Sequence, residues 1–291
     1  MSNIGLIIEE RSRDIGDFLV GRLLPFRKKR MVGPFIYLDH MGPKELGPGE
    51  RVDIGPHPHI GLSTLTYLLS GTIVHRDSLG SEQNITPGAV NWMTAGNGIV
   101  HSERSPEKLD DETQLMHGLQ IWVALPKADE DTEPSFHHIT SNELPQWQEE
   151  GVSYKLVAGE AYGRQSPVPV YSDLFLVELK NQQRASIQPG DYVKGELALY
   201  VLEGSVNACG ETIEKGHLLV AKQGSDCIFE LQPDSHCIML GGEPFEEERH
   251  IYWNFVSSSK EKIEAAKEKW KKREFKEIPN DEGYIPLPGN Q

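Results

Sequence analysis

A succession of short strand-like segments, each closed by turn residues, is the feature that most narrows the folds open to this chain. Segments such as "LSTLTYLLSGTIVHRD", "GLQIWVALP" and "LALYVLEGSVNACG" are rich in β-branched and aromatic residues and are bounded by Gly, Pro, Asp or Asn. Turn signals recur roughly every 8 to 12 residues, which is typical of antiparallel sandwiches and barrels. The sequence therefore predicts an all-β fold.

The C-terminal stretch "SSSKEKIEAAKEKWKKREF", residues 257–275, departs from this pattern and favours a helix. Serines provide a possible N-cap, and Ile263, Ala266 and Trp270 recur at the spacing of one helical face. We expect one amphipathic helix that docks Trp270 on a barrel, followed by an extended tail containing "YIPLP".

The two halves of the chain share a weak internal repeat. When "LTYLLSGTI" is aligned with "LALYVLEGSV" so that Gly71 matches Gly204, Tyr67 falls on Tyr200. A chain of 291 residues is also long enough to form two hydrophobic cores. We therefore predict two tandem barrels and a C-terminal extension that holds the helix and tail, with the bounds 1–135, 136–245 and 246–291.

The charge and hydropathy of the chain exclude several classes of function. Its formal net charge is −15, so the protein would be repelled by a phosphate backbone or an anionic membrane. No apolar stretch has the length of a secretory signal core or of a membrane span. We expect a cytoplasmic protein without direct nucleic-acid or membrane partners. Three cysteines without metal-binding spacing are interpreted as reduced thiols: Cys209, Cys227 and Cys237.

Two short motifs in the first half place ionisable side chains in pairs. In "GPHPHIG", His57 and His59 are two residues apart, and in "GIVHSERS" so are His101 and Glu103. Residues i and i+2 of a strand project from the same face, so each pair would lie side by side. Directed into one barrel, the two pairs predict a metal site with three imidazoles and one carboxylate.

The donor set limits the metal and its role. Imidazoles combined with a carboxylate suit Fe, Mn, Ni, Cu or Zn, and the lack of thiolate ligands argues against a closed structural zinc site. Four protein ligands leave coordination positions open for water, dioxygen or a substrate oxygen, which catalysis requires.

Other polar residues of the first half are interpreted as structural. In "HRDSLG", Asp77 and Ser78 are expected to hydrogen-bond their own backbone in a hairpin. The remaining histidines are placed outside the site. We expect His40, His75 and His117 at strand ends or turns, and His137 and His138 at the surface.

The repeat also tests whether the second barrel could hold a metal. In the alignment above, His57 and His59 fall on Gly190 and Tyr192. In a second register, which places Gly88 on Gly216 and Gly96 on Gly224, His101 and Glu103 fall on Phe229 and Leu231. These side chains cannot replace the ligands, so we expect no metal in the second barrel.

The motifs of the first half resemble those of the pirins, members of the cupin superfamily. The resemblance rests on "RMVGPFIYLDHMGP", "GPHPHIGLSTLTYLLSG", "HRDSLG", "TPGAVNWMTAGNGIVHSE" and "GLQIWVALP", in this order and spacing. It implies a bicupin, two tandem jelly-roll barrels with a C-terminal helix. It further implies one divalent metal in the N-terminal barrel, with Fe²⁺ as the first candidate. The residues that match the ligands are His57, His59, His101 and Glu103.

The same resemblance implies two different functions. Bacterial pirins are similar to quercetinases, which would make this chain a dioxygenase of flavonols or related hydroxylated aromatics, with Glu103 as the catalytic base. Other pirins are regulatory proteins, which would make it a metal-dependent binding module that docks on another protein. Two fused barrels supply the packing that single cupins obtain by dimerising, so we expect a monomer.

Two positions depart from the family pattern, which has Arg and Glu where this chain has Ile60 and Ser63. We expect a less charged pocket rim as a result, and quercetin is not assumed as the physiological substrate. Five apolar residues could line the pocket: Phe35, Ile36, Leu62, Trp92 and Met93. For each of them, a place in the ordinary core is the favoured interpretation.

Overall fold

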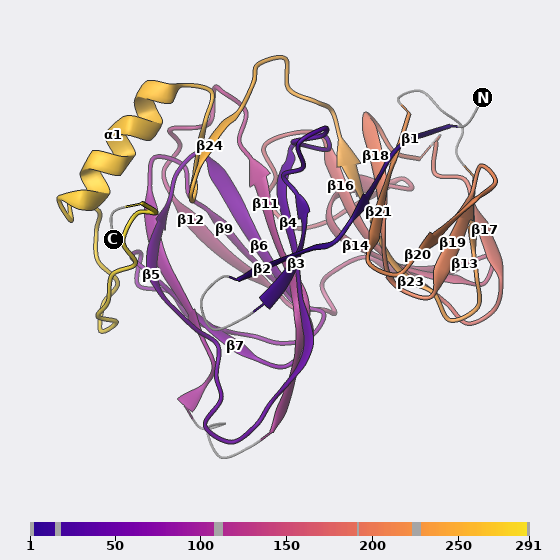
Figure 1. Ribbon diagram of the computed structural model, residues 1–291, viewed down its shortest axis with the longest axis horizontal. Coiled ribbons are helices and arrows are strands. Elements are labelled where there is room, and N and C mark those ends of the chain that lie inside the picture. The colour runs from indigo at the N-terminus through magenta and orange to yellow at the C-terminus, as the bar shows by residue number, and fades with distance from the viewer. Residues whose placement is uncertain (1–2, 15–18, 108–112, 191, 223–227, 290–291) are drawn as a thin grey trace. The chain divides into compact units, whose positions relative to one another are not determined.

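The computed structural model describes residues 3–14, 19–107, 113–190, 192–222 and 228–289. Within these residues the chain forms two β-barrels, each built from a larger and a smaller sheet, and one α-helix near the C-terminus (Figure 1). The predicted all-β fold with two jelly-roll barrels and a C-terminal helix is therefore confirmed. No helix of the described part is long and apolar enough to cross a membrane.

The first barrel consists of a seven-stranded and a four-stranded antiparallel sheet. In spatial order, the larger sheet contains β12 (Ser135–Ile139), β9 (Val90–Thr94), β6 (Leu62–Ser70), β11 (Gln114–Ala124), β4 (Phe35–Leu46), β3 (Leu19–Leu24) and β2 (Arg11–Asp14). The smaller sheet contains β5 (Asp53–His59), β10 (Ile99–Arg104), β7 (Ile73–Asp77) and β8 (Glu82–Ile85).

The second barrel repeats this plan. Its larger sheet contains β1 (Ile4–Glu9), β21 (His217–Ala221), β18 (Glu196–Glu203), β23 (His236–Gly242), β16 (Leu174–Asn181), β14 (Val152–Ala161) and β13 (Gln146–Glu149), with β15 (Arg164–Gln165) paired to β14. Its smaller sheet contains β17 (Ala185–Ile187), β22 (Phe229–Leu231), β19 (Ser205–Ala208) and β20 (Glu211–Glu214).

The strand orders of the two barrels are equivalent, as the internal repeat predicts. The central strand β6 lies between β9 and β11, and its counterpart β18 lies between β21 and β23. Tyr67 and Tyr200, matched in the sequence, lie on these two strands and are both buried. The edge strands differ in origin. β12 follows β11 in the chain, whereas its counterpart β1 comes from the N-terminus and pairs with β21 (Figure 1).

The chain divides into two compact units, and each unit combines segments that are distant in the sequence. The unit that contains the second barrel comprises Met1–Ser12, Gly21–Leu38 and Asn142–Phe245. The unit that contains most of the first barrel comprises Arg13–Val20, Asp39–Ser141 and Glu246–Gln291. The consecutive domain boundaries expected from the sequence, after residues 135 and 245, stay a prediction.

The second barrel is filled by apolar side chains. Its core includes Phe229 and Leu231, the residues aligned with His101 and Glu103 in the repeat, and both are buried. Cys237 belongs to the same core, and burial raises the pKa of its thiol to about 12. These positions therefore serve ordinary packing.

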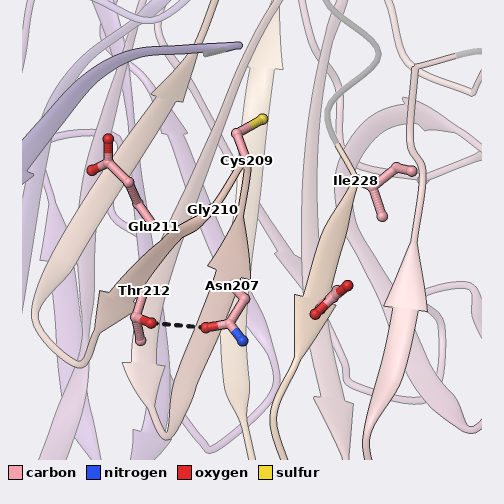
Figure 2. A pocket seen from close by; sticks show the side chains of 7 residues that line it. Asn207, Cys209, Gly210, Glu211, Thr212 and Ile228 are labelled. Atoms are coloured by element: carbon pink, nitrogen blue, oxygen red, sulfur yellow. Dashed lines mark hydrogen bonds between the residues drawn. The ribbon is translucent and has the colours of Figure 1, made fainter. Parts of the chain in front are cut away.

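The other two cysteines lie outside this core. Cys209 is exposed and lies in the turn between β19 and β20 with a φ of 50° (Figure 2). Across this hairpin, Thr212 Oγ1 donates a hydrogen bond of 2.9 Å to Asn207 Oδ1. Cys227 lies outside the described residues, so its predicted reduced state is not addressed by the structure.

The C-terminal helix forms as predicted. Helix α1 (Lys260–Lys271) begins after the N-cap Ser259, whose side chain accepts a hydrogen bond from the backbone N–H of Lys262. Ile263, Ala266 and Trp270 are its buried residues. They pack in one cluster with aliphatic and aromatic residues of the first barrel and of the segments that flank the helix: Ile60, Val100, Phe255, Phe275, Ile278 and Leu287.

The tail after the helix returns to strand β5. The indole N–H of Trp270 donates to the carbonyl oxygen of Ile285 at 2.9 Å. The backbone N–H of Ile285 in turn donates to the carbonyl oxygen of Pro56 at 3.2 Å. The tail thereby fastens the strand that carries His57 and His59.

The tight turn after β5 leaves no room for a side chain at Gly61. Gly61 has a φ of +67°, and a Cβ atom at this position would lie 2.0 Å from the carbonyl oxygen of Val256. Only glycine fits this backbone conformation and this approach without a shift. The turn sets where β5 ends relative to the hairpin formed by β24 (His250–Tyr252) and β25 (Phe255–Ser257).

The pairing of β1 with β21 generates a prediction about stability. Ile8 on β1 is 1% exposed, and its truncation in Ile8→Ala should lower the free energy of unfolding by about 2 to 5 kcal/mol, measured by chemical denaturation. The exposed neighbour Glu9 provides a matched control, because Glu9→Ala should change that free energy by less than about 0.5 kcal/mol. Equal effects of the two substitutions would contradict an integral role for β1.

Candidate metal centre

The antiparallel pairing of β5 with β10 brings the two sequence motifs together. Cα pairing joins His57 to His101 and Ile99 to His59. A register shift follows His101, so that Glu103 pairs with Ile54. Because directly paired residues share a face of the sheet, the three histidines project to the same side.

The imidazoles of His57, His59 and His101 form a compact triangle. The ring centroids lie 4.3 Å apart for His57 and His101, 4.9 Å for His59 and His101, and 5.1 Å for His57 and His59. One nitrogen of each ring lies within 4.8 Å of the others, so the three could hold a metal ion.

Burial keeps these imidazoles uncharged. Desolvation lowers the pKa of His57 to about 4 and lowers the pKa values of His59 and His101 well below the ordinary value for histidine. Repulsion from the neighbouring imidazoles adds to the effect for His59 and His101. Neutral imidazole is the form that binds metals, because a ring nitrogen then has a free lone pair.

The hydrogen bonds of the cluster leave nitrogen atoms available. His57 Nδ1 lies 2.8 Å from the carbonyl oxygen of Gly55 and can only donate to it, which leaves Nε2 as the acceptor nitrogen. His101 Nε2 and His59 Nδ1 are buried without a hydrogen-bond partner among the described residues. A buried polar atom without a partner is unfavourable, and a bound cation would satisfy the free nitrogens. The donor set therefore fits a divalent transition metal.

Glu103 lies beside the histidines and is held by the larger sheet. It is 5% exposed, and Thr66 Oγ1 donates to its Oε1 at 2.7 Å. Thr66 Oγ1 also lies 3.0 Å from Gln120 Oε1. Burial raises the pKa of Glu103, although the hydrogen bond from Thr66 partly offsets the rise. The structure groups the carboxylate with His101 and with a third residue, His75, their ligand atoms lying within 4.8 Å of one another.

His75 was expected at a strand end or turn outside the site, and this prediction is wrong. It is 2% exposed on β7, and its Nδ1 lies 3.4 Å from His101 Nδ1. Asp77 bonds the hairpin backbone as predicted, accepting from Leu79 and Ser81, but it is also buried and bonded to His75. The signal was present in the sequence, since "HRD" is another pair two residues apart on a strand.

The other histidines divide between the surface and the barrel interior. His40 and His117 contact each other, with their Nε2 atoms 2.8 Å apart, and belong to neither group of possible ligands. His137 is exposed as predicted. His138 is half-buried instead, because its Nδ1 bonds Asn91 Oδ1 at 2.6 Å. It lies on β12, an edge strand of the barrel, so the prediction of a surface position for it is wrong.

Two aromatic side chains contact the cluster and were not predicted. Trp122 meets His59 edge to face with centroids 5.1 Å apart, and Phe136 stacks on His75 at 4.4 Å. The residues proposed from the sequence as pocket or core are all buried: Phe35, Ile36, Leu62, Trp92 and Met93.

Both positions that depart from the family pattern are buried. Ile60 packs in the cluster of the C-terminal helix. Ser63 is fully buried, with its Oγ 3.0 Å from Thr94 Oγ1. Strand alternation places Ser63 on the opposite face from Thr64 and Thr66. A less charged pocket rim at these two positions stays a prediction.

This chain is similar to proteins of one family along almost its whole length. The Pirin family model matches residues 18–123, and the model of the Pirin C-terminal cupin domain matches residues 174–276. A pirin-like protein of Caulobacter vibrioides is 48% identical over 98% of this chain and 99% of its own length.

Two further relatives are informative. The crystal structure of a quercetin 2,3-dioxygenase from Acinetobacter baumannii has 35% sequence identity and a TM-score of 0.88, covering 98% of this chain and 96% of its own. Pirin of Rattus norvegicus is 30% identical over 90% of this chain and 89% of its own length.

The lowered histidine pKa values predict how metal-free protein responds to acid. Between pH 6.5 and about 4, the unfolded chain binds protons on these residues that the folded chain does not, so stability falls as the pH falls. Each such histidine contributes up to about 1.4 kcal/mol per pH unit. The free energy of unfolding, measured by urea denaturation across this window, should fall less steeply in His57→Gln than in the wild type.

Glu103 does not obscure this comparison. Its raised pKa contributes stability at low pH that is lost as the pH rises, the opposite sign, and it is present in both proteins. Equal slopes for wild type and His57→Gln would show that His57 is not held neutral by burial.

Proposed function

The chain belongs to the pirin family, and we propose that it is a metal-dependent dioxygenase of flavonols such as quercetin or related hydroxylated aromatics. The observation that carries the proposal is the buried cluster of neutral imidazoles beside a carboxylate, with ring nitrogens that lack partners in the described part of the chain. The quercetin 2,3-dioxygenase of Acinetobacter baumannii supports the reaction class, because it is similar along nearly the whole chain.

The proposed ligands are His57, His59, His101 and Glu103, with Fe²⁺ as the first candidate metal and Mn, Ni, Cu or Zn as alternatives. When bound, such a metal would supply a Lewis-acidic centre with open positions for substrate and dioxygen. The chain's own part is to hold the ligands, shape the space beside them and move a proton.

The wall of the barrel that faces the cluster has two rows of side chains across the larger sheet. Direct cross-strand pairs define each row, and paired residues share a face. What we call the polar row contains His138, Asn91, Thr66 and Gln120. What we call the aromatic row contains Phe136, Met93, Thr64 and Trp122.

The two rows meet different parts of the cluster. The aromatic row contacts imidazoles, through Trp122 on His59 and Phe136 on His75. The polar row reaches the carboxylate, through Thr66 on Glu103. A planar molecule with an apolar face and oxygen atoms along one edge matches this division, which is why we favour a hydroxylated aromatic substrate.

An unused hydrogen-bond donor lies in the polar row. Asn91 is 3% exposed and its Oδ1 is bonded to His138. Its Nδ2 is buried and finds no partner among the residues that the structure describes. A substrate oxygen would satisfy this amide. The donor therefore favours a ligand with an acceptor atom next to the one that approaches Glu103.

Glu103 is the proposed base. A flavonol hydroxyl that approaches the cluster would give its proton to the carboxylate, and the raised pKa of Glu103 increases its affinity for that proton. Thr66 fixes one carboxylate oxygen of Glu103, so the other oxygen is available to the metal or to the substrate. The substrate is thereby converted to its electron-rich anion, the form that reacts with dioxygen.

The direct test is dioxygen uptake by anaerobically iron-loaded protein supplied with quercetin. We expect uptake with ring-opened product, and no uptake by His59→Ala, because that variant lacks one of the proposed ligands. His40→Ala provides the matched control, since His40 is also a buried histidine of the same unit but lies outside the cluster. A protein that holds one metal per chain and consumes no dioxygen would contradict the proposal and favour the alternative, a docking module.

The role of Glu103 has its own prediction. Glu103→Gln keeps the size and the contact with Thr66 but removes the basic oxygen, so turnover should fall by about 10²- to 10⁴-fold. Uptake rates and metal content should be measured on the same samples. A variant that holds the metal and turns over at the wild-type rate would exclude Glu103 as the base.

A further inference from the structure

Strand β7 adds two polar side chains to the face that carries the metal cluster. β7 pairs with β10, and the register joins His101 to Asp77 and Glu103 to His75. Since paired residues share a face, His75 and Asp77 project to the same side as the two proposed ligands. Both are buried, at 2% and 0% exposure.

These residues form a chain of hydrogen bonds that ends on a ligand. His75 Nε2 lies 3.1 Å from Asp77 Oδ2, and His75 Nδ1 lies 3.4 Å from His101 Nδ1. The other carboxylate oxygen, Asp77 Oδ1, accepts from the backbone N–H groups of Leu79 and Ser81 at 2.9 and 3.0 Å. Asp77 is thus fixed by the hairpin that follows β7.

The direction of each hydrogen bond follows from the carboxylate. An ionised carboxylate only accepts, so Nε2 of His75 carries the hydrogen. When the imidazole of His75 is uncharged, its Nδ1 is the acceptor in this pair, and Nδ1 of His101 must donate to it. His101 Nε2 is left with a free lone pair, and this is the nitrogen that is buried without a partner within the described ranges of the chain.

The ring of His75 is also held in orientation by packing. Phe136 stacks on it with an interplanar angle of 14° and centroids 4.4 Å apart. The carboxylate fixes one edge of the imidazole and the phenyl ring fixes its plane. Few alternative orientations remain for the acceptor that faces His101.

We propose that Asp77 and His75 are positioning residues that hold His101 in the tautomer whose Nε2 faces the metal. Residues behind a metal-bound histidine set its tautomer and orientation in general, and their loss lowers metal affinity by about 10- to 100-fold. The inference rests on the proposed metal site, but the tautomer of His101 is a property of the metal-free protein.

The test is Asp77→Asn, examined in two ways. The amide can donate to His75 Nε2, which would reverse the chain of hydrogen bonds and move the hydrogen of His101 to Nε2. Nitrogen-15 NMR of the metal-free protein should show His101 protonated at Nδ1 in the wild type and at Nε2 in Asp77→Asn. Calorimetric titration with Ni²⁺ should show an affinity about 10- to 100-fold lower for the variant.

The control is His117→Gln, because His117 is a buried histidine of the same unit that contacts His40 and belongs to neither ligand group. It should leave the tautomer of His101 unchanged and the Ni²⁺ affinity within about twofold of the wild type. A loss of structure in Asp77→Asn would lower its Ni²⁺ affinity, but it would not convert His101 from one defined tautomer to the other.

The possible outcomes separate this inference from the proposed function. An unchanged His101 tautomer or an unchanged Ni²⁺ affinity in Asp77→Asn would overturn the positioning role. Should Asp77→Asn not fold, His75→Gln should give a mixture of both His101 tautomers, and a purely wild-type tautomer would overturn it. If the wild type binds no Ni²⁺ but the His101 tautomer still differs between wild type and Asp77→Asn as expected, the metal site is rejected and the hydrogen-bond chain is retained.

Discussion

The pairing of β10 with both β5 and β7 is the constraint on which the site depends. Side chains alternate along each strand, so residues two apart share a face, and antiparallel pairing sets three such pairs side by side. One strand contributes two imidazoles, the central strand an imidazole and a carboxylate, and the third the pair that supports them. A shift of one residue in any pairing would turn the corresponding pair away from the others.

Burial gives these side chains their chemical character. Desolvation holds the imidazoles neutral and raises the proton affinity of the carboxylate, which suits ligands and a base. The same burial is unfavourable for folding, because polar atoms without partners lose hydrogen bonds to water. The second barrel has the same strand order, yet it places Phe229 and Leu231 on β22, the strand equivalent to β10, and forms an ordinary core. The strand order is therefore compatible with both interiors, and the side chains on one strand distinguish them.

Much of the architecture could be predicted because its signals are local. Turn residues between β-branched segments indicated barrels, and the spacing of Ile263, Ala266 and Trp270 indicated the helix. The pairs at residues 57, 59, 101 and 103 were found because each lies within three residues of sequence. His75 and Asp77 form such a pair too, but a turn motif that begins at the same residues offered a competing interpretation. Trp122 and Phe136 carried no local signal, because what places them at the cluster is the order of strands in the larger sheet.

The sequence by itself determined the fold class, the internal repeat and the residue types that could bind a metal, since all three depend on short periodic patterns. The tertiary structure alone decided which donors converge and what surrounds them. Convergence depends on strand order and register between segments some forty residues apart, and no pattern within a strand specifies its partner. It also decided which nitrogen of each imidazole is free, because the tautomer follows from hydrogen bonds that exist only when β5, β7 and β10 are paired.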